Sequence, residues 1–209
     1  MKNLIPIENV RKAALRLSDV ALKTPLALNI NASSRYDASV YYKREDFQQV
    51  RSYKIRGAYN KIASLNKSEL EHGVVCASAG NHAQGVAFSC FKLKVKGVVF
   101  MPTPTPKQKI EQVKMFGGAF IEIVIAGDTF DDASFSAKEY CAGNKMSFVH
   151  PFDDEKVIEG QATIALEILE QSKEEIDYLF VPVGGGGVAS GISSIFNELS
   201  PNTKVIGVE

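Results

Sequence analysis

The first segment suited to chemistry is a run of glycines. A strand expected over residues 178–183 leads directly into four of them, Gly184, Gly185, Gly186 and Gly187. Glycine accepts a positive φ, so successive backbone N–H groups can turn toward one point and form a nest for an anion such as phosphate. The spacing is neither GxGxxG nor GxxxxGKS/T, which are typical of dinucleotide and nucleoside-triphosphate sites. Taken alone, the run is explained equally well by a tight turn with close helix packing.

A second segment, residues 52–58, reads Ser-Tyr-Lys-Ile-Arg-Gly-Ala and is expected to open a helix. Its lysine, Lys54, would ordinarily be a solvated surface residue. A buried lysine, however, has a lowered pKa and can form a Schiff base with an aldehyde, and the neighbouring Tyr53 can cover a flat ring. A Schiff-base lysine combined with a phosphate nest indicates one cofactor, pyridoxal 5'-phosphate.

The third segment, residues 78–82, lies between an expected strand at 74–77 and the next helix. In open α/β sheets, ligands bind beyond the carboxyl ends of the strands. The free N–H groups of this segment and the Ser78 hydroxyl predict a pocket for a substrate carboxylate, and Asn81 can donate to a phenolic oxygen. Helix capping is an alternative role for Ser78 and Asn81, and it is compatible with ligand binding. At the helix start, His82 is expected to position a ligand rather than act as a base.

Alternating strands and helices position these three segments. The expected helices begin after Pro6 and then cover residues 53–65, 82–93, 107–116, 128–143, 158–171 and 188–199. The expected strands cover residues 40–43, 74–77, 95–101, 119–125, 147–150, 178–183 and 205–208. The strands are nearly continuous apolar runs, which is typical of parallel strands covered on both faces. The predicted fold class is therefore α/β.

Composition excludes several classes of protein. The chain has 209 residues, of which 24 are basic and 24 acidic, so the basic stripe of a nucleic-acid-binding protein is missing. No apolar run approaches the roughly 18 residues that span a membrane. The N-terminus does not resemble a signal peptide. We therefore expect a soluble cytoplasmic protein with neither nucleic acid nor membrane as a partner.

Cysteine and histidine add no further site. Cys76, Cys90 and Cys141 are widely spaced among small apolar residues, which predicts buried free thiols in a reducing compartment. The histidines form no HExxH motif and no cluster with cysteine, so no metal site is predicted.

Four motifs, in order, resemble the threonine dehydratase (threonine ammonia-lyase) and serine racemase family of fold-type II pyridoxal phosphate enzymes. They are Lys-Arg-Glu-Asp at 43–46, the lysine segment at 52–58, Ser-Ala-Gly-Asn-His-Ala-Gln-Gly at 78–85 and Pro-Val-Gly-Gly-Gly-Gly at 182–187. The resemblance covers nearly the whole chain and points to the biosynthetic type of threonine dehydratase. One departure is Ala162, where the family has a second glycine, and we expect alanine to be tolerated there on a helix.

The resemblance implies roles for the candidate residues. Lys54 would carry the Schiff base, Tyr53 would pack on the cofactor ring and Asn81 would bond the 3'-oxygen of that ring. The implied phosphate site comprises Gly184, Gly185, Gly186, Gly187 and Val188. The implied substrate site comprises Ser78, Ala79, Gly80, Asn81 and His82.

The same resemblance implies two open, twisted parallel-sheet domains with the cofactor in the cleft between them. The large domain would comprise residues 1–48 and 149–209, and the small domain residues 49–148. The implied activity is dehydration and deamination of L-threonine or L-serine to 2-oxobutanoate or pyruvate and ammonia, the first step of isoleucine biosynthesis. A homo-oligomer is the implied assembly.

Two alternatives stay open. Racemisation of serine requires a second acid–base group, which the racemases of the family supply as a serine where this chain has Ala79, so dehydration is favoured. The large domain of the family also continues beyond the strand at 205–208, whereas this sequence stops at Glu209. The second alternative is therefore a truncated, catalytically inactive fragment that binds pyridoxal phosphate.

Overall fold

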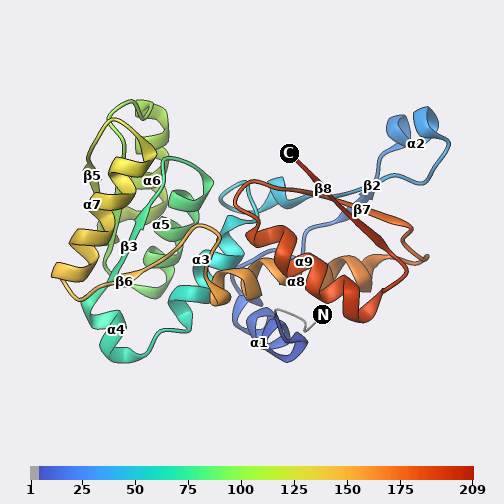
Figure 1. The fold of residues 1–209 in the computed structure, drawn as a ribbon, viewed down its shortest axis with the longest axis horizontal. Helices are drawn as coiled ribbons and strands as arrows, with labels where there is room; N and C mark the ends of the chain where they lie inside the picture. Colours follow the sequence, from blue (N-terminus) through green and yellow to red (C-terminus); the bar gives the residue numbers. More distant parts are fainter. Residues whose placement is uncertain (1–4) are drawn as a thin grey trace.

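The computed structural model of the protein describes residues 5–209. Figure 1 shows two groups of elements side by side, one built on a four-stranded sheet and the other on a layer of helices with a two-stranded sheet. Helix α3 (Lys54–Ala63) lies where the two groups meet and packs against a helix of each. The predicted site residues come from both groups.

The four-stranded sheet is parallel throughout, with the strand order β5-β4-β3-β6. Its strands are β3 (Val74–Ala77), β4 (Gly97–Met101), β5 (Ile121–Ile125) and β6 (Ser147–Phe148). One set of alternate side chains, which includes Cys76, faces α5 (Asn81–Leu93) and α6 (Lys107–Gly117). The other set, which includes Val75, faces α7 (Phe130–Gly143). Both faces are covered, as the apolar strand pattern predicts.

The second group is centred on two packed helices, α8 (Glu155–Gln171) and α9 (Gly187–Leu199), and α1 (Ile7–Leu17) packs on α8. Strands β7 (Tyr178–Pro182) and β8 (Lys204–Val208) form a parallel pair beside them. Buried side chains of the helices and of β7 form one apolar cluster. In the part of the chain that the structure describes, no helix is long and apolar enough to cross a membrane.

The N-terminal region departs from the prediction that all strands are parallel. Strand β1 (Leu26–Leu28) pairs antiparallel with β2 (Tyr41–Lys43), and α2 (Ile30–Tyr36) connects them. Strand β2 agrees with the strand expected at 40–43, whereas β1, α2 and the helix α4 (Lys67–His72) were not predicted. These three elements have only three to seven residues, which is too short for a periodic apolar pattern to appear. Asparagine caps hold both short helices, Asn29 for α2 and Asn66 for α4.

Two strands begin later than the sequence predicts. The N–H of Val95 donates to the carbonyl of Cys90, and Lys94 has a φ of +55°, so both residues belong to the turn that ends α5. The strand expected from Ala119 is preceded by a 3-10 helix, η2 (Gly118–Phe120). In both cases apolar residues next to the strand belong to the turn that follows the preceding helix. An apolar pattern alone does not distinguish such a turn from the start of a strand.

Glycines allow α3 and α8 to approach closely. A Cβ atom at Gly160 would lie 2.5 Å from the backbone oxygen of Arg56 and 2.7 Å from the Cα atom of Gly57. Any side chain at this crossing would push the two helices apart. Ala162, where the family pattern has glycine, is fully buried in α8 and lies against Gly191 of α9.

Beside this crossing, a buried arginine ties three segments together. The side chain of Arg56 is 1% exposed, and its guanidinium donates to Glu45 at 2.8 Å and to Glu167 at 2.6 Å. Glu45 lies in the 3-10 helix η1 (Glu45–Phe47), whereas Glu167 lies in α8. Burial opposes the charge of Arg56, but the hydrogen bonds from both carboxylates outweigh this cost and raise its pKa. The N-terminal region, α3 and α8 are therefore held at one point.

Lys43 completes a cluster of four charges around this point. Its ammonium group donates to Glu167, and also to the backbone oxygen of Thr24 at 2.6 Å. The Thr24 hydroxyl in turn donates to Glu45 at 2.6 Å. We call Lys43, Glu45, Arg56 and Glu167 the Arg56 cluster. Each charge has an opposite partner, as charges removed from water require.

Replacing Arg56 by methionine should destabilise the fold, because it leaves Glu45 without its cationic partner in a largely buried position. We expect the free energy of unfolding to fall by about 3–5 kcal/mol, which is typical when one member of a buried ion pair is removed. Urea unfolding followed by circular dichroism measures this loss.

The matched control is Arg11→Met, which removes an exposed ion pair with Glu8. Such a pair contributes about 1 kcal/mol or less. Equal losses in the two variants would contradict a special role for the Arg56 cluster.

Candidate active site

Lys54 is the first residue of α3, and its side chain is half-buried. Its Nζ donates to the backbone oxygen of Pro151 at 2.6 Å. Burial lowers the pKa of this amine, because desolvation disfavours the charged form. The Nζ atom lies 5.5 Å from the centroid of the Tyr53 ring. The environment of Lys54 is therefore that of an amine prepared to act as a nucleophile or base.

Pro151 lies in the loop between β6 and α8, and β6 is a direct neighbour of β3 in the sheet. The loops after β3 and β6 therefore leave the same edge of the sheet, which is where ligands of α/β folds bind. The Nδ1 atom of His150 accepts the backbone N–H groups of Phe152 at 3.3 Å and of Asp153 at 2.7 Å, so the loop is held in one conformation. No role was predicted from the sequence for this loop. Its place after a parallel strand is the signal that points to it.

His82 is buried close to Lys54. Its Nε2 donates to the backbone oxygen of Val149 at 2.9 Å, so the other ring nitrogen, Nδ1, carries no proton in the neutral ring. Burial, together with the charges of Lys54 and His150, lowers the pKa of His82 to about 4 against the opposing effect of the Val149 hydrogen bond. The imidazole is therefore neutral at neutral pH, which fits a positioning role.

The segment 78–82 turns from β3 into α5. The N-cap of α5 is Gly80 and no side chain caps the helix, so capping as the role of Ser78 and Asn81 is wrong. Instead, the Ser78 hydroxyl accepts the N–H of Gly80 at 3.2 Å. The Asn81 side chain is exposed, and a Cβ atom at Gly80 would meet no atom within 4 Å. The helix N-terminus and Asn81 are thus open to a ligand.

The glycine loop precedes α9 in the same way. Gly186 is the N-cap residue and has a φ of +84°, a conformation that favours glycine, and no side chain caps the helix. A Cβ atom at Gly184 or Gly186 would meet no atom within 4 Å. The side chain of Val188 is buried, which leaves only its backbone N–H to face a ligand. An uncapped helix N-terminus beside open space is a site for an anion such as phosphate.

The other two glycines of the loop contact the loop after β6. A Cβ atom at Gly185 would lie 2.2 Å from the ring of Phe152, and one at Gly187 would lie 2.6 Å from the backbone oxygen of the same residue. Phe152 directly follows Pro151, whose oxygen accepts the hydrogen bond of Lys54. Pro151 thus contacts the predicted lysine, and its neighbour Phe152 contacts the predicted glycine loop.

The three predicted segments differ in how directly they meet. The segment 78–82 reaches Lys54 through α5, because a Cβ atom at Gly85 would lie 3.0 Å from the carbonyl group of Lys54. The ring of Tyr53 is partly buried against the apolar cluster of α8 and α9. No hydrogen bond joins Asn81 to Lys54 in the described residues. Asn81 and Lys54 are therefore not linked directly.

These residues fit pyridoxal phosphate. Ser52 Oγ, two residues before Lys54, and His82 Nδ1 are buried atoms without a hydrogen-bond partner. Buried polar atoms are normally paired, so unpaired ones beside a half-buried lysine suit a site that takes up a polar ligand. Lys54 provides the amine, and the residues 184–188 provide backbone N–H groups next to open space.

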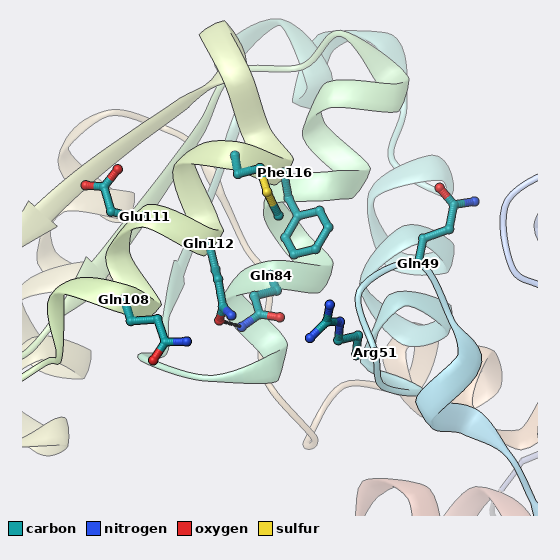
Figure 2. A pocket seen from close by; sticks show the side chains of 8 residues that line it. Gln49, Arg51, Gln84, Gln108, Glu111, Gln112 and Phe116 are labelled. Carbon is teal, nitrogen blue, oxygen red and sulfur yellow. Dashed lines mark hydrogen bonds between the residues drawn. The ribbon is translucent and has the colours of Figure 1, made fainter.

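An open pocket of about 630 Å³ lies between α5, α6 and the segment before α3 (Figure 2). It is lined by Gln49, Arg51, Gln84, Gln108, Glu111, Gln112, Met115 and Phe116. Within it, Gln84 donates to Gln112 at 3.0 Å. None of the predicted site residues lines this pocket.

The cysteines offer no alternative nucleophile. Cys76, Cys90 and Cys141 are buried and unpaired, which confirms the prediction from their apolar neighbours. Burial raises the pKa of each thiol, in Cys90 to about 12, so the reactive thiolate is scarce. Within residues 5–209, no group of three or more His, Cys, Asp and Glu side chains is placed to hold a metal ion.

Comparison with known proteins identifies close relatives. The chain is 54% identical over 205 residues to the biosynthetic L-threonine dehydratase of Halalkalibacterium halodurans. The aligned region covers 98% of this chain and 49% of the relative. The chain is 51% identical to the corresponding protein of Bacillus subtilis, with 99% and 49% covered. The chain thus spans about half the length of the curated relatives it matches.

Solved structures agree. The processed form of threonine deaminase isoform 2 from Solanum lycopersicum superposes with a TM-score of 0.91 at 44% identity, over 97% of this chain and 55% of that one. Maize serine racemase gives a TM-score of 0.92 at 30% identity, over 98% and 61%. The family model described as pyridoxal-phosphate dependent enzyme matches residues 17–209. The chain therefore belongs to the family of pyridoxal-phosphate dependent enzymes.

Proposed function

We propose that the protein catalyses dehydration and deamination of L-threonine, and of L-serine, to 2-oxobutanoate or pyruvate and ammonia, the first step of isoleucine biosynthesis. The observation that carries the proposal is Lys54, a half-buried amine with a lowered pKa. Two consecutive residues, Pro151 and Phe152, connect it to the glycine loop. The names of the relatives and their identity of about 50% support the choice of substrate.

Pyridoxal phosphate, when bound, supplies an electron sink for the Cα carbon of an amino acid. We assign its phosphate to the backbone N–H groups of residues 184–188 and its ring to Tyr53 and Asn81. Lys54 is the residue that we expect to bond it covalently. The uncapped N-terminus of α9 favours the negative charge of the phosphate.

Lys54 also takes the Cα proton of the substrate in this proposal. Its lowered pKa raises the fraction of neutral amine at neutral pH, as a general base requires. The oxygen of Pro151 orients Nζ at 2.6 Å while the amine is free. The segment 78–82 holds the substrate carboxylate with its N–H groups and Ser78, and neutral His82 supports this loop without competing for protons.

The nature of residue 79 favours elimination over racemisation. Ala79 is partly exposed in the loop that we assign to the substrate carboxylate, and its methyl group cannot carry a proton. Proton return to the opposite side of Cα then has no donor at this position. Loss of the β-hydroxyl is the remaining outcome.

We further propose that the protein acts in the cytoplasm as a homo-oligomer. The three unpaired cysteines support a reducing compartment.

The two packed groups of elements support a division into a domain of residues 49–148 and a domain formed by the rest, with the site between them.

Lys54 should be the lysine that carries the cofactor. Borohydride reduction of the protein loaded with pyridoxal phosphate, followed by peptide mapping, should place the label on Lys54, because the other residues of the proposed site provide no amine. The variant Lys54→Ala should lose the label, whereas Lys92→Ala, at an exposed position near the end of α5, should retain it. A label on another lysine of the unaltered protein would overturn the assignment.

Replacing Ala79 by serine should introduce racemisation, because a hydroxyl can return a proton where the methyl group cannot. With L-serine as substrate, we expect the unaltered protein to form pyruvate with D-serine as a minor product at most. The Ala79→Ser variant should raise the fraction of D-serine, as measured by chiral chromatography. D-serine formed as fast as pyruvate by the unaltered protein would refute the argument.

Replacing Gly185 by alanine should weaken cofactor binding, because the new Cβ atom would fall 2.2 Å from the Phe152 ring. Overpacking of this kind costs about 1–3 kcal/mol, and each 1.4 kcal/mol corresponds to a factor of ten in affinity. Fluorescence titration with pyridoxal phosphate measures the change.

Gly143→Ala serves as the control, since a Cβ atom at Gly143 would meet no atom within 4 Å. Its affinity for the cofactor should match that of the unaltered protein. Unchanged affinity in Gly185→Ala would show that the glycine loop does not hold the cofactor.

A further inference from the structure

Phe152 is an aromatic residue outside the core. Its side chain is only partly buried, and it belongs to none of the four apolar clusters formed by the described residues. A ring gains most of its stabilising energy by burial in such a cluster. The position of Phe152 is therefore not explained by core packing.

Its contacts fix the ring against the glycine loop. Three ring atoms would lie 2.2–2.4 Å from a Cβ atom at Gly185, so the ring covers the Cα atom of that glycine. The ring also meets the His150 imidazole edge-on, with centroids 4.7 Å apart and planes at 84°. The backbone N–H of Phe152 donates to Nδ1 of the same histidine. Phe152 is thus held in place by polar and glycine neighbours while part of the ring stays uncovered.

Phe152 directly follows the residue that binds the proposed reacting amine. The preceding residue, Pro151, accepts the hydrogen bond of Lys54 Nζ at 2.6 Å. A substrate that gives its Cα proton to Nζ must place Cα next to this nitrogen. Its carboxylate is assigned to the segment 78–82 after β3, and the loop after the neighbouring strand β6, which carries Phe152, is then the nearest apolar surface for its side chain.

We propose that Phe152 is a specificity-determining residue, against which the side chain of the substrate amino acid packs. The inference rests on the proposed function and deepens it. Threonine differs from serine by one methyl group on the β-carbon, and an apolar ring favours the substrate that carries this methyl group. A methyl or methylene group in an apolar pocket changes kcat/KM by about 10- to 200-fold. The ring therefore makes the protein prefer threonine.

The test compares Phe152→Ala and Phe152→Leu with the unaltered protein, loaded with pyridoxal phosphate. We expect the ratio of kcat/KM for threonine to that for serine to fall about tenfold or more in Phe152→Ala and less in Phe152→Leu. The control is Phe148→Leu. The ring centroid of Phe148 lies 6.2 Å from that of His150, but Phe148 packs against the apolar cluster around α7. Its ratio should stay unchanged.

A second measurement does not depend on turnover. L-alanine and L-2-aminobutyrate lack the hydroxyl group that is eliminated, and they differ in one methylene group beyond the β-carbon. Titration by difference absorbance gives the ratio of their dissociation constants. The preference for 2-aminobutyrate should decrease in Phe152→Ala and Phe152→Leu but persist in Phe148→Leu. If Phe152→Ala does not fold, Phe152→Leu alone decides the outcome.

The outcomes separate this inference from the proposed function. Ratios unchanged in the Phe152 variants, with threonine still converted, would overturn the role of Phe152 and leave the function intact. Failure of the unaltered protein to convert threonine or serine would contradict the function. The ratio of the dissociation constants for L-alanine and L-2-aminobutyrate, compared between the unaltered protein and the Phe152 variants, would still decide the role of Phe152.

Discussion

The close crossing of α3 and α8 is the constraint on which the site depends. Glycines at 57 and 160 bring the two backbones together, and the Arg56 cluster fixes them at that distance. Helix α3 begins with Lys54, and α8 follows the loop that contains Pro151. Both ends of the hydrogen bond from Lys54 to Pro151 are therefore set by one pair of helices. Charges that cost energy to bury thus contribute to the position of the amine.

Around this fixed amine, the site is built mainly from backbone groups. The loops after β3 and β7 each end in an uncapped helix N-terminus beside open space. Helix N-termini hold negative charge without a charged side chain. Lysine then supplies the only amine that the proposed chemistry needs, and burial lowers its pKa. In the proposed site, the loops therefore bind the anions and α3 positions the base.

Much of this could be predicted from the sequence, and the exceptions have physical reasons. The α/β class and the family follow from apolar strand runs and from four motifs, which are local signals. The contacts of Pro151 and Phe152 with Lys54 and the glycine loop were not predicted, because they join residues that lie far apart in the chain. The capping role of Ser78 and Asn81 was wrong because residue type does not reveal which residue has the backbone conformation of a cap. Strand β2 was predicted, but β1 and its antiparallel pairing with β2 were not, because a strand of three residues gives no periodic signal.

The central claim is that Lys54 and the glycine loop hold the two ends of one cofactor molecule. A crystal structure of the protein grown with pyridoxal phosphate tests it most directly. The account predicts continuous electron density from Lys54 Nζ into the cofactor, with the phosphate at the N–H groups of residues 184–188. A cofactor attached to another lysine, or a phosphate bound elsewhere, for example beside Arg51, would contradict it.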